Sequence, residues 1–68
     1  MSELRVQFGW RLRQLRRQKD LTQEQLAEAA GISMDMLNNI ERGVNAPSFE
    51  TLEKLHWVLA VVKLGEHW

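Results

Sequence analysis

Side chains suited to hydrogen bonding, and not to bond making, gather on one face of a short predicted helix near the middle of the chain. Leu37 and Ile40 stand three residues apart and form the apolar side of this helix, about residues 34–41. The opposite side is led by Met34, Asp35, Asn38 and Asn39. An amide both donates and accepts, a carboxylate accepts, and a thioether offers mainly apolar contact. These residue types predict recognition of a partner through matching donors, acceptors and methyl groups.

Catalysis and metal binding are not indicated by the other polar residues. His56 and His67 lie eleven residues apart, and the carboxylates nearest to them are Glu53 and Glu66. The serines fall at predicted helix caps, so no nucleophile, base and orienting group converge. A metal site made from both histidines and Glu66 would need a fold-back that the spacing does not favour. We therefore expect no enzyme activity, no cofactor, no metal and no small-molecule ligand.

An amphipathic helix over about residues 2–19 is the first element that must position this face. Its apolar residues recur every three or four positions, at Leu4, Phe8, Leu12 and Leu15. Asp20 is expected to end the helix, because aspartate tolerates left-handed backbone.

Two short helices follow, each with a marked start. Thr22 and Gln25 form the pattern of a capping box, which predicts a helix over about residues 23–30. The small packing face of that helix is Leu26, Ala27 and Ala30. Gly31 suits a sharp left-handed turn, and Ser33 is the expected cap of the helix over 34–41.

A loop over residues 42–47 leads to a fourth helix, which Ser48 is expected to cap. Its predicted inward residues are Phe49, Leu52, Leu55 and Leu59. Residues 61–68 fit either a short fifth helix that buries Leu64 and Trp68 or a strand over 61–64. The helix is favoured, because residues 65–67 are poor strand formers. The predicted fold class is all-α, a compact bundle of four to five short helices in one domain over residues 1–68.

Length and charge narrow the class of protein further. The chain has 68 residues and no cysteine, so packing alone holds one small core, and a reducing, cytoplasmic setting is expected. No apolar run nears about eighteen residues, so neither a membrane span nor a signal peptide is expected. The formal net charge is zero, but residues 1–19 hold six basic and one acidic residue, whereas residues 20–53 hold one basic and seven acidic residues. Such segregation can steer association although the total is neutral.

Residues 23–42 have the layout of a helix-turn-helix. Ala27 is small where two crossing helices touch, Gly31 sits where the chain reverses, and Leu37 anchors the second helix together with Ile40. In a helix-turn-helix the second helix enters the major groove of DNA.

The sequence resembles the Cro/C1-type (XRE-like) helix-turn-helix domains of phage repressors and small bacterial regulators, which have the lambda-repressor-like fold. The resemblance covers about residues 8–59. It rests on the motifs RLRQLR (11–16), LTQEQLA (21–27), AGIS (30–33), IERG (40–43) and PSFETL (47–52). It implies sequence-specific binding of double-stranded DNA and transcriptional regulation, with repression as the expected direction.

The resemblance also assigns roles to residues outside the free helix face. It implies DNA phosphate contacts from Gln23, Ser33, Arg42 and Asn45. Arg16 and Glu41 match an ion pair that ties the helix over 34–41 to the first helix. Glu41 is therefore expected to be structural.

Base reading is expected from the free face of the helix over 34–41. Asn38 and Asn39 could each pair bidentately with adenine, Asp35 could accept from a cytosine amino group, and Met34 could lie against a thymine methyl. The alternative is that Asp35 only complements the positive helix N-terminus while Met34 packs on the surface.

A homodimer is expected, because one such helix reads few base pairs and a two-fold dimer reads two half-sites about 34 Å apart. The apolar surplus of residues 57–68 is the expected interface, through Trp57, Val58, Val61, Val62 and Trp68. The alternative is that the two tryptophans close a small core. A second function stays open, that of an antitoxin-type module that binds a partner protein such as a toxin and regulates its own operon.

Overall fold

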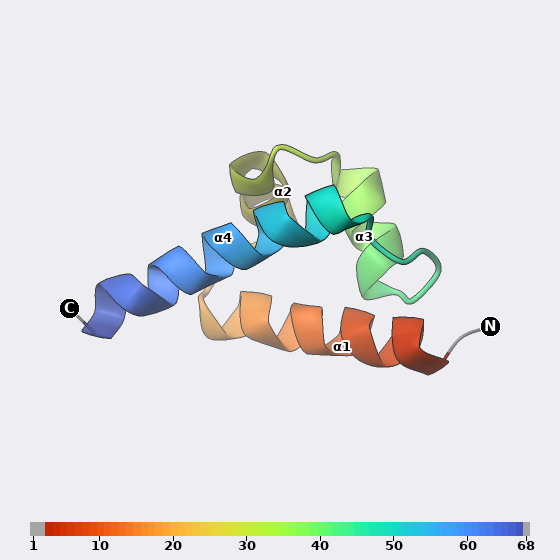
Figure 1. The fold of residues 1–68 in the computed structure, drawn as a ribbon, viewed down its shortest axis with the longest axis horizontal. Helices are drawn as coiled ribbons and strands as arrows, with labels where there is room; N and C mark the ends of the chain where they lie inside the picture. The colour runs from red at the N-terminus through yellow and green to blue at the C-terminus, as the bar shows by residue number, and fades with distance from the viewer. Residues whose placement is uncertain (1–2, 68) are drawn as a thin grey trace.

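The computed structural model describes the backbone of residues 3–67 and the side chains of residues 3–59. Every regular element in this part is a helix: α1 (Glu3–Gln18), α2 (Gln23–Ala30), α3 (Met34–Glu41) and α4 (Phe49–His67). The short helices α2 and α3 pack on each other, α3 also packs on α1, and α2 also packs on α4 (Figure 1). The predicted all-α class is confirmed.

The helix ends form where the sequence marks them. The Thr22 hydroxyl accepts from the backbone N–H of Gln25 at 3.0 Å, and the Gln25 side chain accepts from the backbone N–H of Thr22 at 2.9 Å. Asp20 and Gly31 adopt left-handed backbone, with φ of 56° and 70°. Ser33 caps α3 through the N–H of Met36. These local signals fix the lengths of α2 and α3, and therefore the angle at which α3 is presented.

Among the residues whose side chains are described, seven form a small core where the four helices meet: Leu12, Leu26, Ala27, Ala30, Leu37, Ile40 and Leu55. Five partly buried residues pack around it: Phe8, Leu21, Ile32, Val58 and Leu59. Because α2 and α3 contribute five of the seven core residues, their mutual geometry is set by packing as well as by the turn between them.

Four residues of the predicted apolar stripes are exposed, and two of them, Leu15 and Leu52, lie at the edge of the core with 36% exposure each. Leu4 is 74% exposed and Phe49 is 89% exposed. The inward line of α1 runs through Gly9, Leu12 and Arg16, not through the leucines alone, so Leu4 falls to one side of it. Phe49 is the first residue of α4, and at about 100° per residue it points roughly 120° away from the buried Leu55.

The end of the chain differs from both expectations. Residues 61–67 are helical, so the strand is wrong, and they continue α4 without a break, so a separate fifth helix is wrong as well. The five residues after Leu59, residues 60–64, include no proline, glycine or asparagine that would stop the helix. The far end of α4 projects beyond the end of α1 (Figure 1). The expected burial of Leu64 and Trp68 concerns side chains outside the described residues.

A close approach between α1 and the end of α3 was not apparent from the sequence. Gly9 is buried, and a Cβ built on it would clash with the carbonyl oxygen of Ile40 and lie 2.7 Å from that of Glu41. Gly43, at φ 78°, lies against Val6 in the same contact. Two glycines therefore let α3 rest directly on the backbone of α1.

The described helices include none that is both long enough and apolar enough to cross a lipid bilayer.

Candidate functional site

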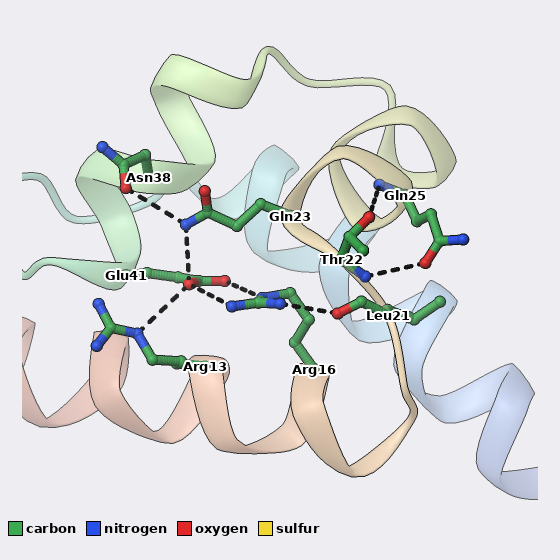
Figure 2. A network of polar contacts seen from close by, with 8 residues as sticks. All are labelled: Arg13, Arg16, Leu21, Thr22, Gln23, Gln25, Asn38 and Glu41. Carbon is green, nitrogen blue, oxygen red and sulfur yellow. Dashed lines mark hydrogen bonds and ion pairs between the residues drawn. The ribbon is translucent and has the colours of Figure 1, made fainter.

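The Glu41 carboxylate is the centre of a polar network that joins α1, α2 and α3 (Figure 2). Its oxygens accept from Arg16 Nε at 2.8 Å and from Arg16 Nη2 at 3.2 Å. Arg16 also donates through Nη1 to the carbonyl oxygen of Leu21 at 2.7 Å. The Glu41 side chain is fully buried and that of Arg16 is nearly so. A two-pronged, buried pair of this kind fixes the orientation of α3 on α1 as well as binding the two helices together.

Arg13 is a further member of the network that the sequence reasoning missed. Its Nε lies 3.6 Å from Glu41 Oε1, and its side chain is 36% exposed. Arg13 lies one turn before Arg16, so the two guanidinium groups share a face of α1. That spacing is the signal that could have found it. Arg13 is the solvent-facing cation of the cluster.

Gln23, the first residue of α2, turns its side-chain amide into this network. Its Nε2 donates to Glu41 Oε1 at 3.1 Å and to Asn38 Oδ1 at 3.3 Å. Both side-chain N–H bonds are therefore engaged inside the molecule. A phosphate contact at this position falls to the backbone N–H groups in the first turn of α2, which have no intrahelical acceptor.

The outward face of α3 lies open beside the N-terminus of α2. Met34 is 47% exposed, Asp35 is exposed, and Asn38 and Asn39 are half-buried. The structure thus brings the four expected base-reading residues onto one surface, while Leu37 and Ile40 hold the other side in the core. Ser33 lies exposed at the start of the same surface, with its oxygen accepting the capping bond.

The loop after α3 carries the remaining predicted contacts. Arg42 and Asn45 are both exposed. The backbone N–H groups of Val44 and Asn45 donate to the carbonyl oxygen of Asn39, which holds the loop against the end of α3. Asn45 lines a hollow of about 450 Å³ together with Arg5 and the start of α4. Side chains that could grip a phosphate backbone therefore flank α3 at both ends.

The predicted dimer residues divide into three groups. Trp57 is 65% exposed on α4, whereas Val58 is half-buried and packs on the core of its own chain. The side chains of Val61, Val62 and Trp68 lie outside the described residues. Among these predicted dimer residues, Trp57 is thus the one whose described side chain is open to contact with another molecule.

The described part of the chain contains no group of three histidine, cysteine, aspartate or glutamate side chains that could hold a metal ion.

Residues 12–66 match the sequence profile of a family described as helix-turn-helix. The matched span contains α2, α3, the Glu41 network and most of α4.

Several curated proteins are similar to the chain. It is 42% identical over 53 residues to the immunity repressor protein of Bacillus phage phi105, and this alignment covers 78% of the chain and 37% of the phage protein. It is 41% identical over 55 residues to the HTH-type transcriptional regulator SinR of Bacillus subtilis, covering 79% and 50%. Over 59 residues it is 37% identical to the HTH-type transcriptional regulator y4dJ of Sinorhizobium fredii, covering 87% and 77%. The chain spans between a third and a half of the length of the first two of these relatives and most of the third.

Proposed function

Because the chain belongs to the Cro/C1-type helix-turn-helix family, we propose that it binds double-stranded DNA sequence-specifically and represses transcription, as a homodimer on a palindromic operator. The phage phi105 and SinR relatives carry the names of a repressor and a regulator, which supports this assignment. The observation that carries the proposal is the open polar face of α3, held on α1 by the buried Arg16–Glu41 pair. A rigid, exposed helix of this kind fits the major groove.

In the proposed complex α3 reads bases and its two flanks hold phosphates. The four residues that face the base edges are Met34, Asp35, Asn38 and Asn39. Ser33, Arg42 and Asn45 contact the sugar-phosphate backbone, and Gln23 contributes its backbone N–H at the start of α2. The helix dipole of α2 favours a phosphate at that end.

The charge distribution shapes how tightly any duplex is held. Glu41 neutralises part of the positive charge that Arg13 and Arg16 bring to the site. Because binding to random DNA depends on phosphate neutralisation, a chain with a net charge of zero is expected to bind it weakly. Specific hydrogen bonds from α3 and dimerisation must then provide much of the affinity for the operator.

The proposed homodimer forms through residues 57–68, of which residues 57–67 are the second half of α4. Trp57 is exposed there, and the helix projects past α1 (Figure 1). Exposure of a large apolar side chain such as tryptophan to water is unfavourable, and tryptophans are frequent at the centre of protein interfaces. The antitoxin-type function stays a prediction, which no contact of the described residues addresses.

The test is in vitro selection of bound duplexes from a random pool, followed by competition of the selected duplex against random DNA. We expect a palindromic sequence whose half-site centres lie about 34 Å apart. Asp35→Ala and Asn39→Ala should lower the ratio of specific to random binding. Glu53→Ala and Gln14→Ala, on exposed surfaces of α4 and α1, are matched controls that should leave it unchanged. If both α3 variants keep the wild-type ratio, α3 does not read bases.

A further inference from the structure

We infer that Asn38 meets its partner as a hydrogen-bond donor only, and so reads guanine in preference to adenine, because Glu41 fixes its amide through Gln23. This inference rests on the proposed function, since it concerns the base that α3 contacts. It replaces the adenine pairing that the sequence suggested for Asn38, and leaves that pairing open for Asn39.

The chain of constraints begins at Glu41. The carboxylate, paired with Arg16 at 2.8 Å, is an acceptor with no proton to donate. A glutamine amide next to it can therefore present only its N–H₂ group, and not its oxygen. Gln23 does so, with Nε2 at 3.1 Å from Glu41 Oε1. The buried ion pair thus decides which way round the Gln23 amide stands.

The second constraint passes from Gln23 to Asn38. Nε2 of Gln23 carries two hydrogens, one directed to Glu41 and the other to Asn38 at 3.3 Å. A donor must be met by an acceptor, so Asn38 has to turn its Oδ1 toward Gln23. Its N–H₂ then points away from Gln23 and Glu41, as Figure 2 shows. Two amides that could each be flipped in isolation are fixed because they are linked in series to a carboxylate.

The orientation of Asn38 determines which base edge it can match. Bidentate pairing with adenine needs both the oxygen and the nitrogen of an asparagine amide, to meet the N6 donor and the N7 acceptor. The oxygen of Asn38 is turned toward Gln23, away from the side on which its N–H₂ meets a partner. Guanine offers two acceptors in the major groove, N7 and O6, whereas the cytosine N4 amino group offers only a donor. An outward N–H₂ group therefore favours guanine, and the single acceptors of thymine (O4) and adenine (N7) are weaker matches.

The two hydrogen bonds in series, from Gln23 to Glu41 and from Gln23 to Asn38, form a relay that sets the direction of the Asn38 amide. Single substitutions can break this relay or reverse the hydrogen-bonding character of the outward group. Gln23→Leu removes the donor that holds Oδ1, so the Asn38 amide is free to turn and pair with adenine in the bidentate way. Asn38→Asp keeps an oxygen for Gln23 but replaces the outward N–H₂ with a second oxygen, which accepts from cytosine N4 or adenine N6. Asn38→Ala removes the contact and identifies, by loss of preference, the base pair that Asn38 reads. Gln14→Leu, at an exposed position of α1, is the matched control for Gln23→Leu.

The experiment selects duplexes with each variant and then compares the four base pairs at the position that Asn38→Ala identifies. The wild-type protein should prefer guanine over adenine there by about tenfold, the scale of one good base contact. Gln23→Leu should move the preference to adenine, Asn38→Asp should move it to cytosine or adenine, and Gln14→Leu should leave it on guanine. Preference for adenine by the wild type, or an unmoved preference in Gln23→Leu, would overturn the inference while the proposed function stands. A pool in which no variant enriches any sequence contradicts the proposed function itself and the inference with it.

A second readout uses the free protein and needs no DNA. Side-chain amide hydrogens engaged inside a protein exchange with water more slowly than those facing solvent. In nuclear magnetic resonance spectra the Gln23 side-chain N–H₂ should exchange more slowly than that of Asn38 and that of the exposed Gln14. The same comparison after Asn38→Ala should show faster exchange at Gln23. Equal exchange at Gln23 and Gln14 in the wild type would overturn the relay whatever the DNA result.

Discussion

Replacing Gly9 with alanine should destabilise the fold, although the same change in an ordinary helix stabilises it. Glycine in a helix interior normally costs about 0.5–1 kcal/mol relative to alanine. At Gly9 the added methyl group would clash with the Ile40 carbonyl oxygen, and it would lie 2.7 Å from the Glu41 oxygen and 2.9 Å from its carbonyl carbon. All three atoms belong to backbone, so no side chain can rotate out of the way.

The expected size of the effect follows from what must move. Extra methyl groups forced into packed sites cost about 1–3 kcal/mol. At Gly9 the strain falls on the α1–α3 contact, and any retreat of α1 stretches the Arg16–Glu41 bond of 2.8 Å. Because the clash is with rigid backbone, we take the strain at about 3 kcal/mol, the upper end of this range. Alanine regains up to about 1 kcal/mol of helix propensity, so the expected net loss of stability is about 2 kcal/mol. Domains of this size are stable by roughly 3–10 kcal/mol, so the loss would be plain.

Urea unfolding followed by circular dichroism measures this change directly, provided that the slope of the transition stays the same in both proteins. Gln14→Ala is the matched control, because it changes helix propensity at an exposed site of α1 and should move stability by less than about 0.5 kcal/mol. A Gly9→Ala protein as stable as the wild type, or more so, would refute the close contact between α1 and α3.

Three further predictions concern the network, the loop and the dimer. Glu41→Ala leaves Arg16 buried without its partner and should lower the free energy of unfolding in urea by about 3–5 kcal/mol. The double variant Arg16→Met with Glu41→Leu should recover most of that loss, because no charge stays buried. Equal losses in the two proteins would exclude the buried charge as the cause. Gly43→Ala should lower the free energy of unfolding by about 1–3 kcal/mol, because alanine is strained in left-handed backbone and its methyl group would press on Val6. The loss should appear as a lower melting temperature, and an unchanged melting temperature would contradict the contact with Val6. Trp57→Ser should shift the protein from dimer to monomer in sedimentation velocity with its helical content unchanged, and a wild-type monomer at tens of micromolar, with or without operator DNA, would refute the dimer proposal.

The sequence was sufficient wherever a local signal decides the structure. The capping signals act within one turn of their own position: Thr22 with Gln25 starts α2, Gly31 ends it, and Ser33 starts α3. Their types and spacing therefore predict these helix ends without knowledge of the rest of the fold. Resemblance to a known family then supplied the Arg16 and Glu41 pairing, whose partners are distant in the chain.

What the sequence could not supply depends on how distant segments meet. Gly9 looks like a weak point in α1 until the carbonyl groups at the end of α3 are seen against it. Phe49 fits an apolar pattern, but its place at the first position of α4 turns it to solvent. The orientation of Asn38 follows from a hydrogen bond to a residue fifteen positions earlier. Periodicity predicts which face of a helix is apolar, but it carries no information on contacts between helices.

The residues that stabilise α3 and those proposed to choose its target alternate along one short helix. Leu37, Ile40 and Glu41 hold α3 in place, whereas the side chains of Met34 and Asp35 are exposed and make no hydrogen bond to the described residues. A library of variants randomised at these two positions should therefore contain mostly folded proteins that prefer different operator sequences. Asn38 differs, because its amide is matched to Gln23 on another helix. Transplanting α3 alone into a related protein would separate that pair, so new specificities should transfer faithfully only when both residues move together.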